Sequence, residues 1–299
     1  MEEDTIKDCL DRWKAQDSMI ESFSQNFNEW MSQFPEDLKS IIRELLKHFE
    51  YYSQQRMNSY AVPYFHALLD EIDFYEKKAV FSPLKFREDH PDSSTMFSYE
   101  FIFINKLTEE DWCQTKSQQK ELFKKAQIIV VVDDICGSGK TFNDFMQDNC
   151  DLLKGKEVVY IVYHFMKNAR PLIDESAKRF GVHLHVIYQQ AYEKGFSLIS
   201  PVHSPQEDIR TFCEFSEKVG VSGKYVLGFQ DSEALVSFHH DTPNDTLGLF
   251  WFKRGQYWPI FPGKEFRSKT KTLQASQEKR ALLKKMSYGT TKERNQRDR

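Results

Sequence analysis

Hydrophobic residues recur along the first quarter of the chain at the spacing of amphipathic helices. Two series show this spacing, Leu38, Ile41, Ile42, Leu45, Leu46 and Phe49, and then Phe65, Leu68, Leu69 and Ile72. Pro35 followed by Glu36 and Asp37 is typical of a helix start, because the first helical turn favours negative charge. The pattern predicts a helical N-terminal region over residues 1–78, which is either a cap on the main domain or an interaction surface.

From residue 79 onwards, apolar runs alternate with amphipathic stretches. Strands are predicted at 99–105 and 127–132 and in the runs VVYIVYHF and HLHVIYQ. Helices are predicted around 109–125, 142–153 and 169–180. The continuous β-branched run at 127–132 is typical of a strand covered on both faces, as in a parallel sheet. The alternation predicts an α/β domain over residues 79–263, with a Rossmann-like, mainly parallel sheet and right-handed crossovers.

Beyond residue 200 the alternation gives way to shorter segments. Residues 205–220 are predicted to be helical, and the runs KYVLGF and ALVSFHH are predicted to be strands. The turn-rich DTPNDT and the apolar run LGLFWF follow. Together these segments predict a C-terminal, strand-rich hood over the edge of the sheet.

The composition narrows the class of protein. Hydrophobic residues make up 40% of the 299 positions and charged residues 29%, which is typical of a globular chain. No apolar run approaches the roughly 20 residues of a membrane-spanning helix. The start, MEEDTIKDCLDRW, is too acidic and polar for a secretory signal, so a cytoplasmic location is expected. Five scattered cysteines without a CxxC pair favour reduced thiols over zinc sites or disulfides.

Charge is distributed unevenly along the chain. The tail at 264–299 carries 12 Lys and Arg against 4 Asp and Glu, whereas residues 1–263 carry a net charge of −12. A basic tail on an acidic body is compatible with nucleic-acid binding. It is equally compatible with a solvated, partly helical tail that folds back on the body.

The run VVVDDICGSGKT, at 130–141, carries the candidate chemistry. Asp133 and Asp134 come directly after the predicted buried strand, and ligands of parallel sheets bind at the carboxyl ends of strands. Carboxylates can accept hydrogen bonds from a ribose diol or hold Mg²⁺ through water. We therefore expect these two residues to bind the sugar end of a ligand.

The second half of the same run has the chemistry of an anion site. Gly137 and Gly139 let backbone amides approach an anion closely, and a helix is predicted to begin near Thr141. The hydroxyls of Ser138 and Thr141 and the charge of Lys140 add further partners for a phosphate. A diol site next to a phosphate site describes a ribose 5-phosphate.

Two alternatives explain parts of the run. A nucleotide P-loop, G-x-x-x-x-G-K-[ST], requires a glycine five positions before Gly139, where this chain has Asp134. Acids at this place would also repel a triphosphate. A buried strand whose terminal acids merely cap the next helix would look partly similar.

The order of apolar strand, two acids, two spacers and a small loop closed by Thr resembles the phosphoribosyl pyrophosphate motif of type I phosphoribosyltransferases. The usual loop ends in Thr-Thr-Gly-x-Thr, whereas this one reads Gly-Ser-Gly-Lys-Thr at 137–141. The resemblance implies that Asp133 and Asp134 are the catalytic acids, with indirect Mg²⁺ binding. It also implies a ribose-5-phosphate loop, composed of Ile135, Cys136, Gly137, Ser138, Gly139, Lys140 and Thr141.

A second resemblance covers residues 35–262. The stretch at 225–252 followed by WPIFPG is similar to the C-terminal half of a phosphoribosyltransferase-like family of bacterial conflict and antiphage-defence effectors, PRTase-CE. That family also has a helical N-terminal region and an Asp-Ser-rich loop before an early strand. The resemblance implies that Asp92, Ser93 and Ser94 lie near the pyrophosphate. This short loop has no basic residue, although Lys85 and two further basic positions precede it.

The acceptor pocket is predicted from aromatic, amide and imidazole side chains, which stack on bases and read their edges. The candidates are Phe229, Asp231, His239, Asn244 and Trp251, with His240 as an alternative to its neighbour. Adjacent strand residues point to opposite faces, so at most one of the two histidines should enter a pocket. Core packing of Phe229 and Trp251, and a turn built by Asn244 and Asp245, are the competing explanations.

Three functions remain open on these observations. The first is an antiphage or conflict effector enzyme that transfers or removes a phosphoribosyl group, using phosphoribosyl pyrophosphate or a related nucleotide and Mg²⁺. The second is an inactive ribose-phosphate sensor that regulates a defence partner, such as a reverse transcriptase or nuclease. The third is a nucleic-acid-binding protein that acts through its basic tail.

Overall fold

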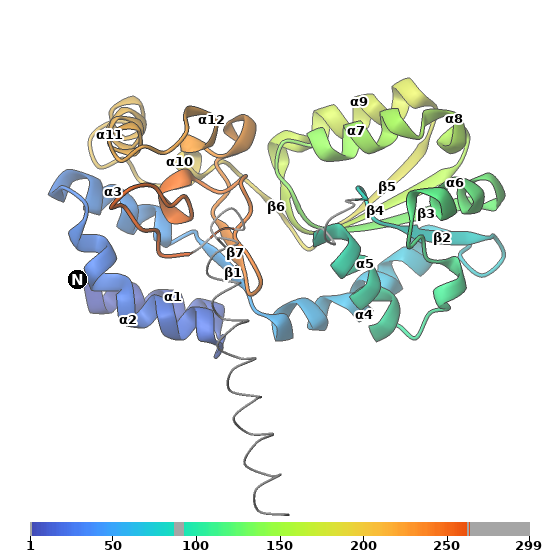
Figure 1. Ribbon diagram of the computed structural model, residues 1–299, viewed down its shortest axis with the longest axis horizontal. Helices are drawn as coiled ribbons and strands as arrows, with labels where there is room; N and C mark the ends of the chain where they lie inside the picture. Colours follow the sequence, from blue (N-terminus) through green and yellow to red (C-terminus); the bar gives the residue numbers. More distant parts are fainter. Residues whose placement is uncertain (1, 87–92, 262, 264–299) are drawn as a thin grey trace, which may run out of the picture. The chain divides into compact units, whose positions relative to one another are not determined.

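The computed structural model describes residues 2–86, 93–261 and 263, and Figure 1 shows their arrangement. The chain divides into two compact units, 1–262 and 263–299, and every described helix and strand belongs to the first. The basic tail at 264–299 lies outside the described residues, and its role stays a prediction. Within the described part of the chain, no helix is both long and apolar enough to cross a bilayer.

A parallel sheet forms the centre of the α/β region. β3 (Ile128–Cys136) lies between β2 (Ala79–Ser82) and β4 (Glu157–Met166). β5 (His183–Ile187) pairs with the first half of β4, and β6 (Ala191–Tyr192) pairs with its end. All of these pairings are parallel. The prediction of a mixed α/β fold with a parallel, Rossmann-like sheet is confirmed.

Helices cover both faces of this sheet (Figure 1). On one face, Val130 and Val132 of β3 pack in a core with α4 (Gln54–Glu71) and α5 (Ser93–Ile104). On the other face, Val131 packs with residues of α6 (Lys116–Lys125), α7 (Lys140–Asp148) and α9 (Arg170–Phe180). Because alternate strand residues point to opposite faces, both sets of residues are apolar in the first part of β3, from Ile128 to Val132.

The N-terminal region begins with three helices, α1 (Glu2–Trp13), α2 (Ser18–Ser32) and α3 (Glu36–Leu46). The helix start predicted from Pro35 is confirmed, since α3 begins at the next residue with Pro35 in extended conformation at its N-cap. The region is not wholly helical, however. It contains β1 (Glu50–Tyr52), which pairs in parallel with β7 (Val236–Phe238).

Aromatic side chains join this N-terminal region to the C-terminal segment. The rings of Phe49 and Phe250 lie 4.9 Å apart, and those of Phe23 and Phe261 stack at 5.4 Å. Trp30 Nε1 donates a hydrogen bond to the Tyr257 hydroxyl across 3.2 Å. Residues at the two ends of the described chain therefore share one core.

The other elements are short or lie at the periphery. They are η1 (Glu109–Asp111), α8 (Cys150–Leu153), η2 (Lys167–Ala169), α10 (Gly195–Leu198), α11 (Pro205–Lys218), α12 (Gly223–Val226), η3 (Phe229–Asp231) and η4 (Gly248–Phe250).

The predicted strand at 99–105 is wrong, because these residues form the second half of α5 and its end. The alternation of large apolar residues suggested a period of two. In the helix, Phe97 and Phe101 are fully buried one turn apart, whereas Tyr99 is 40% exposed and Phe103 is 71% exposed. The apparent alternation arose because aromatic residues also occupy the outer face of this helix.

The C-terminal region holds fewer strands than predicted. ALVSFHH contains β7, but KYVLGF forms α12 and a turn at Gly228, whose φ is +76°. The turn brings Gly228 against the Asp245 carbonyl, so a Cβ there would lie 2.1 Å from that oxygen. Beyond residue 200, β7 is the only strand in the described chain, and the prediction of a strand-rich hood is wrong in that respect. Short helical turns and aromatic packing take the place of the expected strands.

Candidate functional site at the carboxyl end of the sheet

Asp133 and Asp134 lie near the end of β3, and different residues contact them. Both are 6% exposed. Asp133 accepts a hydrogen bond from the Tyr160 hydroxyl across 3.2 Å. Asp134 accepts one from the Ile135 amide across 3.0 Å and lies 3.9 Å from His240 Nε2. The strand alternation thus gives the pair two different environments.

Asp133 belongs to a network beneath the loop. Tyr160 is buried in β4 and its ring stacks on Phe142 of α7, with centroids 4.3 Å apart. Burial raises the pKa of the Tyr160 hydroxyl well above its usual range and also raises the pKa of the Cys136 thiol. Both groups therefore stay neutral, and the Tyr160 hydroxyl can donate to the Asp133 carboxylate. Asp133 consequently ties the strand end to the layer of α7.

The glycines give the loop its shape. Gly139 has a φ of +80°, and a Cβ there would lie 3.1 Å from both the Ala169 carbonyl and Ile173 Cγ2. Asn168 Nδ2 donates to the Gly137 carbonyl across 3.3 Å. The segment that follows β4 therefore supports the loop from below. Only a residue without a side chain fits this turn comfortably.

α7 starts directly from this turn. Gly139 is its N-cap and offers no side-chain hydrogen bond, and the Ser138 hydroxyl accepts one from the Lys140 amide, across 3.3 Å. The N-terminus of a helix presents N–H groups and a positive dipole end, which favour an anion. The backbone at 137–141 thus has the form of an anion site.

The side chain of Lys140 forms an ion pair within α7. Its Nζ lies 2.8 Å from each carboxylate oxygen of Asp144, one helical turn further on. The Lys140 side chain is 44% exposed, and surface ion pairs at this spacing are weak, about 0.3–0.5 kcal/mol. A phosphate could therefore draw the ammonium group away from Asp144 at small cost.

A cavity of about 400 Å³ opens beside α7. Its lining combines two lysines and two aspartates with polar and apolar residues, namely Leu84, Lys85, Phe86, Lys116, Gln119, Asp144, Gln147 and Asp148. Lys116 Nζ lies 3.9 Å from Asp148 Oδ2. The formal charges of the lining therefore balance, and a phosphate group in this cavity would have to compete with the aspartates for the lysines.

The predicted pyrophosphate residues are only partly described. Asp92 lies outside the described residues. Ser93 begins α5, and the buried Ser94 accepts a hydrogen bond from the Leu84 amide across 3.1 Å. Ser94 therefore anchors the chain next to Lys85. A role of these residues toward pyrophosphate stays a prediction.

The predicted acceptor residues do not share one environment. Trp251 is 1% exposed and donates to the Thr246 carbonyl, so it is a core residue. Asp231 and Asn244 are exposed, and Phe229 is partly exposed. Of the two histidines, the side chain of His240 approaches the acid pair, whereas the His239 amide donates to the Tyr52 carbonyl in continuation of the β1–β7 pairing.

Asp245 is a site residue that the sequence analysis assigned only to a turn. Its carboxylate lies directly on the loop, where a Cβ added at Gly137 would be 1.8 Å from Asp245 Oδ1. Burial and then the nearby charge of Asp134 raise the pKa of Asp245 to about 7, against the attraction of Lys85. No pattern in the sequence indicates that this turn, more than a hundred residues away, folds over the loop.

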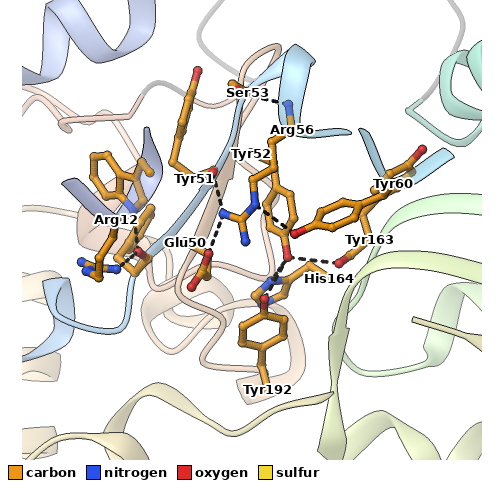
Figure 2. A network of polar contacts seen from close by, with 12 residues as sticks. Arg12, Glu50, Tyr51, Tyr52, Ser53, Arg56, Tyr60, Tyr163, His164 and Tyr192 are labelled. Atoms are coloured by element: carbon orange, nitrogen blue, oxygen red, sulfur yellow. Dashed lines mark hydrogen bonds and ion pairs between the residues drawn. The ribbon is translucent and has the colours of Figure 1, made fainter. Parts of the chain in front are cut away.

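A second group missed by the sequence analysis surrounds His164 (Figure 2). His164 stands opposite Ile135 in the β3–β4 register. The Tyr192 ring stacks on His164 at 3.9 Å. The Tyr52 hydroxyl lies 3.5 Å from His164 Nδ1 and 3.0 Å from the Tyr192 hydroxyl. Burial lowers the pKa of His164 to about 3, so the imidazole is neutral. β1 is thereby connected to the sheet edge that carries the acids.

A parallel sheet with two acids and a glycine loop at its carboxyl edge defines a phosphoribosyltransferase-like α/β protein. The family model PRTase-CE matches residues 27–262, and the chain belongs to this family. The match includes β1, the sheet, the loop and β7. No curated protein and no solved structure matches the chain.

Proposed function

We propose that the chain binds a ribose 5-phosphate, in the form of phosphoribosyl pyrophosphate or a related nucleotide. The observation that carries this proposal is the junction of β3 and α7, where a carboxylate pair and a helix start with glycine at its N-cap are separated by only a few residues. The N–H groups at 137–141 would bind the 5-phosphate. Hydroxyl groups of Ser138 and Thr141 would add hydrogen bonds.

The structure favours different roles for the two acids. Asp133 is engaged by Tyr160 beneath the loop, whereas Asp134 lies on the side of His240 and Asp245. Asp134 is therefore the better candidate for accepting hydrogen bonds from the ribose diol, and Asp133 for holding the strand end in place. The pyrophosphate would extend toward the cavity that Lys85 and Lys116 line.

Magnesium is the expected cofactor. In the described part of the chain, no group of three or more His, Cys, Asp and Glu side chains is arranged to hold a metal. Mg²⁺ usually takes one or two carboxylates, several waters and substrate phosphates, and Asp134 with a pyrophosphate fits that donor set. Bound there, the ion would neutralise charge on the leaving pyrophosphate.

As an enzyme, the protein would displace pyrophosphate, or a nucleotide's base, from the anomeric carbon. The chain's contribution would be to hold the 5-phosphate and the diol so that the anomeric carbon faces the acceptor, with fixed dipoles around the developing charge. Such an activity would suit an intracellular antiphage effector that depletes nucleotides or modifies nucleic acid. The acceptor would enter from the side of His240, between the loop and the C-terminal segment.

A ribose-phosphate sensor is the second candidate. The Asp245 carboxylate on the loop favours it, because this acid occupies space beside the groups that a transferase would present to its substrate. A sensor would pass occupancy of the loop to a defence partner, such as a reverse transcriptase or nuclease. The basic tail would then provide for contact with nucleic acid.

Calorimetry with phosphoribosyl pyrophosphate and Mg²⁺ tests the binding proposal. We expect the wild type to bind, Asp134→Asn to bind at least about tenfold more weakly, and the control Glu217→Gln, at an exposed position of α11, to match the wild type. Incubation with a panel of nucleobases and nucleotides, followed by chromatography, separates the two functions. Conversion supports the transferase, and binding without conversion supports the sensor. Folded wild-type protein that binds no ribose phosphate would contradict both.

A further inference from the structure

Asp245 is held in place by its own backbone. The Asp245 carbonyl accepts hydrogen bonds from the Ala234 amide at 3.1 Å and the Ser232 hydroxyl at 2.7 Å. The Asn244 carbonyl accepts one from the Phe229 amide at 2.9 Å. Gly228 has no side chain to separate the two turns, and its virtual Cβ would clash with the Asp245 carbonyl. These contacts fix the backbone of Asp245, so a change of position of its carboxylate requires rotation of the side chain.

The Asp245 side chain lies directly on Gly137 of the loop. With 1.8 Å between Asp245 Oδ1 and a virtual Gly137 Cβ, the carboxylate fills the space that any side chain at position 137 would take. Asp134 is near enough to perturb it, and Lys85 is the nearby cation. A phosphate on the N–H groups of 137–141 would come to lie beside a second anion, and like charges repel strongly in a partly buried site.

We propose that Asp245 is a built-in competitor for the phosphate end of this site. This inference rests on the proposed function and deepens it by naming how access to the loop is controlled. The carboxylate and the 5-phosphate exclude one another, so the side chain rotates off Gly137 when a phosphate binds. The affinity for ribose phosphates is consequently set by a residue of the C-terminal segment and not by the loop alone.

A direct role of Asp245 in binding the ligand would change the affinity of the variants in the opposite direction. If Asp245 instead accepted a hydrogen bond from a ribose hydroxyl, removal of its charge would weaken binding. Asp245→Asn keeps the shape of the side chain, and Asp245→Ala removes it. Glu217→Gln is the matched control, because it removes an exposed carboxylate from α11, outside the candidate site.

The test is calorimetric titration of the full chain with ribose 5-phosphate, after thermal unfolding has shown that each variant is folded. We expect both Asp245 variants to bind about tenfold more tightly than the wild type, with Glu217→Gln unchanged. Binding by the Asp245 variants alone would support the proposal equally. Equal or weaker binding by the variants overturns it and leaves the proposed function intact. Lack of binding by all folded proteins overturns both.

Discussion

The hydroxyl of Tyr160 donates a hydrogen bond to Asp133 Oδ2 across 3.2 Å, from the neighbouring strand and inside the core. A buried carboxylate is costly unless donors surround it. This contact therefore allows an acid to stand at the end of a strand that is otherwise apolar on that face.

Removal of the hydroxyl tests this dependence. Tyr160→Phe leaves the ring stacked on Phe142 but takes a donor from Asp133, so the free energy of unfolding should fall by about 1–3 kcal/mol. Urea unfolding followed by circular dichroism measures the change. Tyr75→Phe, at a side chain that is 79% exposed, should leave stability unaltered. Equal stability of Tyr160→Phe and wild type would show that Asp133 does not depend on this donor.

The turn at Gly139 gives a second prediction. Alanine at a positive φ costs about 1–2 kcal/mol, and here its Cβ would also press on Ala169 and Ile173. Gly139→Ala should therefore destabilise the protein more than Gly155→Ala, whose φ is +74° with open space around the position. The difference between the two variants in thermal unfolding isolates the packing of the loop on the segment after β4. Equal losses would mean that the loop can move away from that segment.

His164 should make the protein sensitive to acid. Its folded pKa of about 3 lies below the usual 6.5, so the unfolded chain binds the extra proton first as the pH falls. The contribution of neutral His164 to the free energy of unfolding is complete above pH 6.5. Below that pH the free energy of unfolding declines, by about 2 kcal/mol between pH 6.5 and 5. His164→Phe should remove this decline. Denaturant unfolding at several pH values checks it, with the exposed His183→Phe as a control that keeps the wild-type profile.

Asp245 should act on stability in the opposite direction. Its folded pKa of about 7 lies above the usual 3.8, so the folded protein loses stability as the pH rises from about 4 to 7, and nothing further above that. Asp245→Asn should match the wild type near pH 4 and exceed it by about 1–2 kcal/mol at pH 8, because the site is partly exposed. Thermal unfolding across this range measures the gain. A constant difference at every pH would show that the charge of Asp245 is not the cause.

The sequence was sufficient to predict the central strands and the loop, because their pattern is set by local chemistry. β3 and β4 are largely apolar runs, the two acids lie near the end of β3, and the glycines follow it directly. The failures concern segments whose environment depends on distant residues. α5 looked like a strand because large apolar side chains lie on its exposed face as well as in the core.

In the candidate site, too, a local pattern indicates some residues and only the folded chain brings in others. The residues of the candidate loop, from Asp133 to Thr141, are contiguous, so a motif in the sequence can indicate them. Asp245 and His164 reach the site through the folding of the C-terminal segment and the end of β4, which no local pattern records. A polar residue in a turn and a histidine in an apolar run both have commoner explanations.

The parallel pairing of β1 with β7 also determines how the chain can fold. Glu50 stands opposite Val236, so the short sheet forms only after a loop of nearly two hundred residues has closed. Contacts so distant in sequence slow folding, because the entropy of the intervening chain is lost before the pairing repays it. During synthesis, the aromatic face of α1 to α3 stays uncovered until the last part of the chain has been made. A fragment that ends before β7 would leave that face and the edge of β1 uncovered, as a site for aggregation.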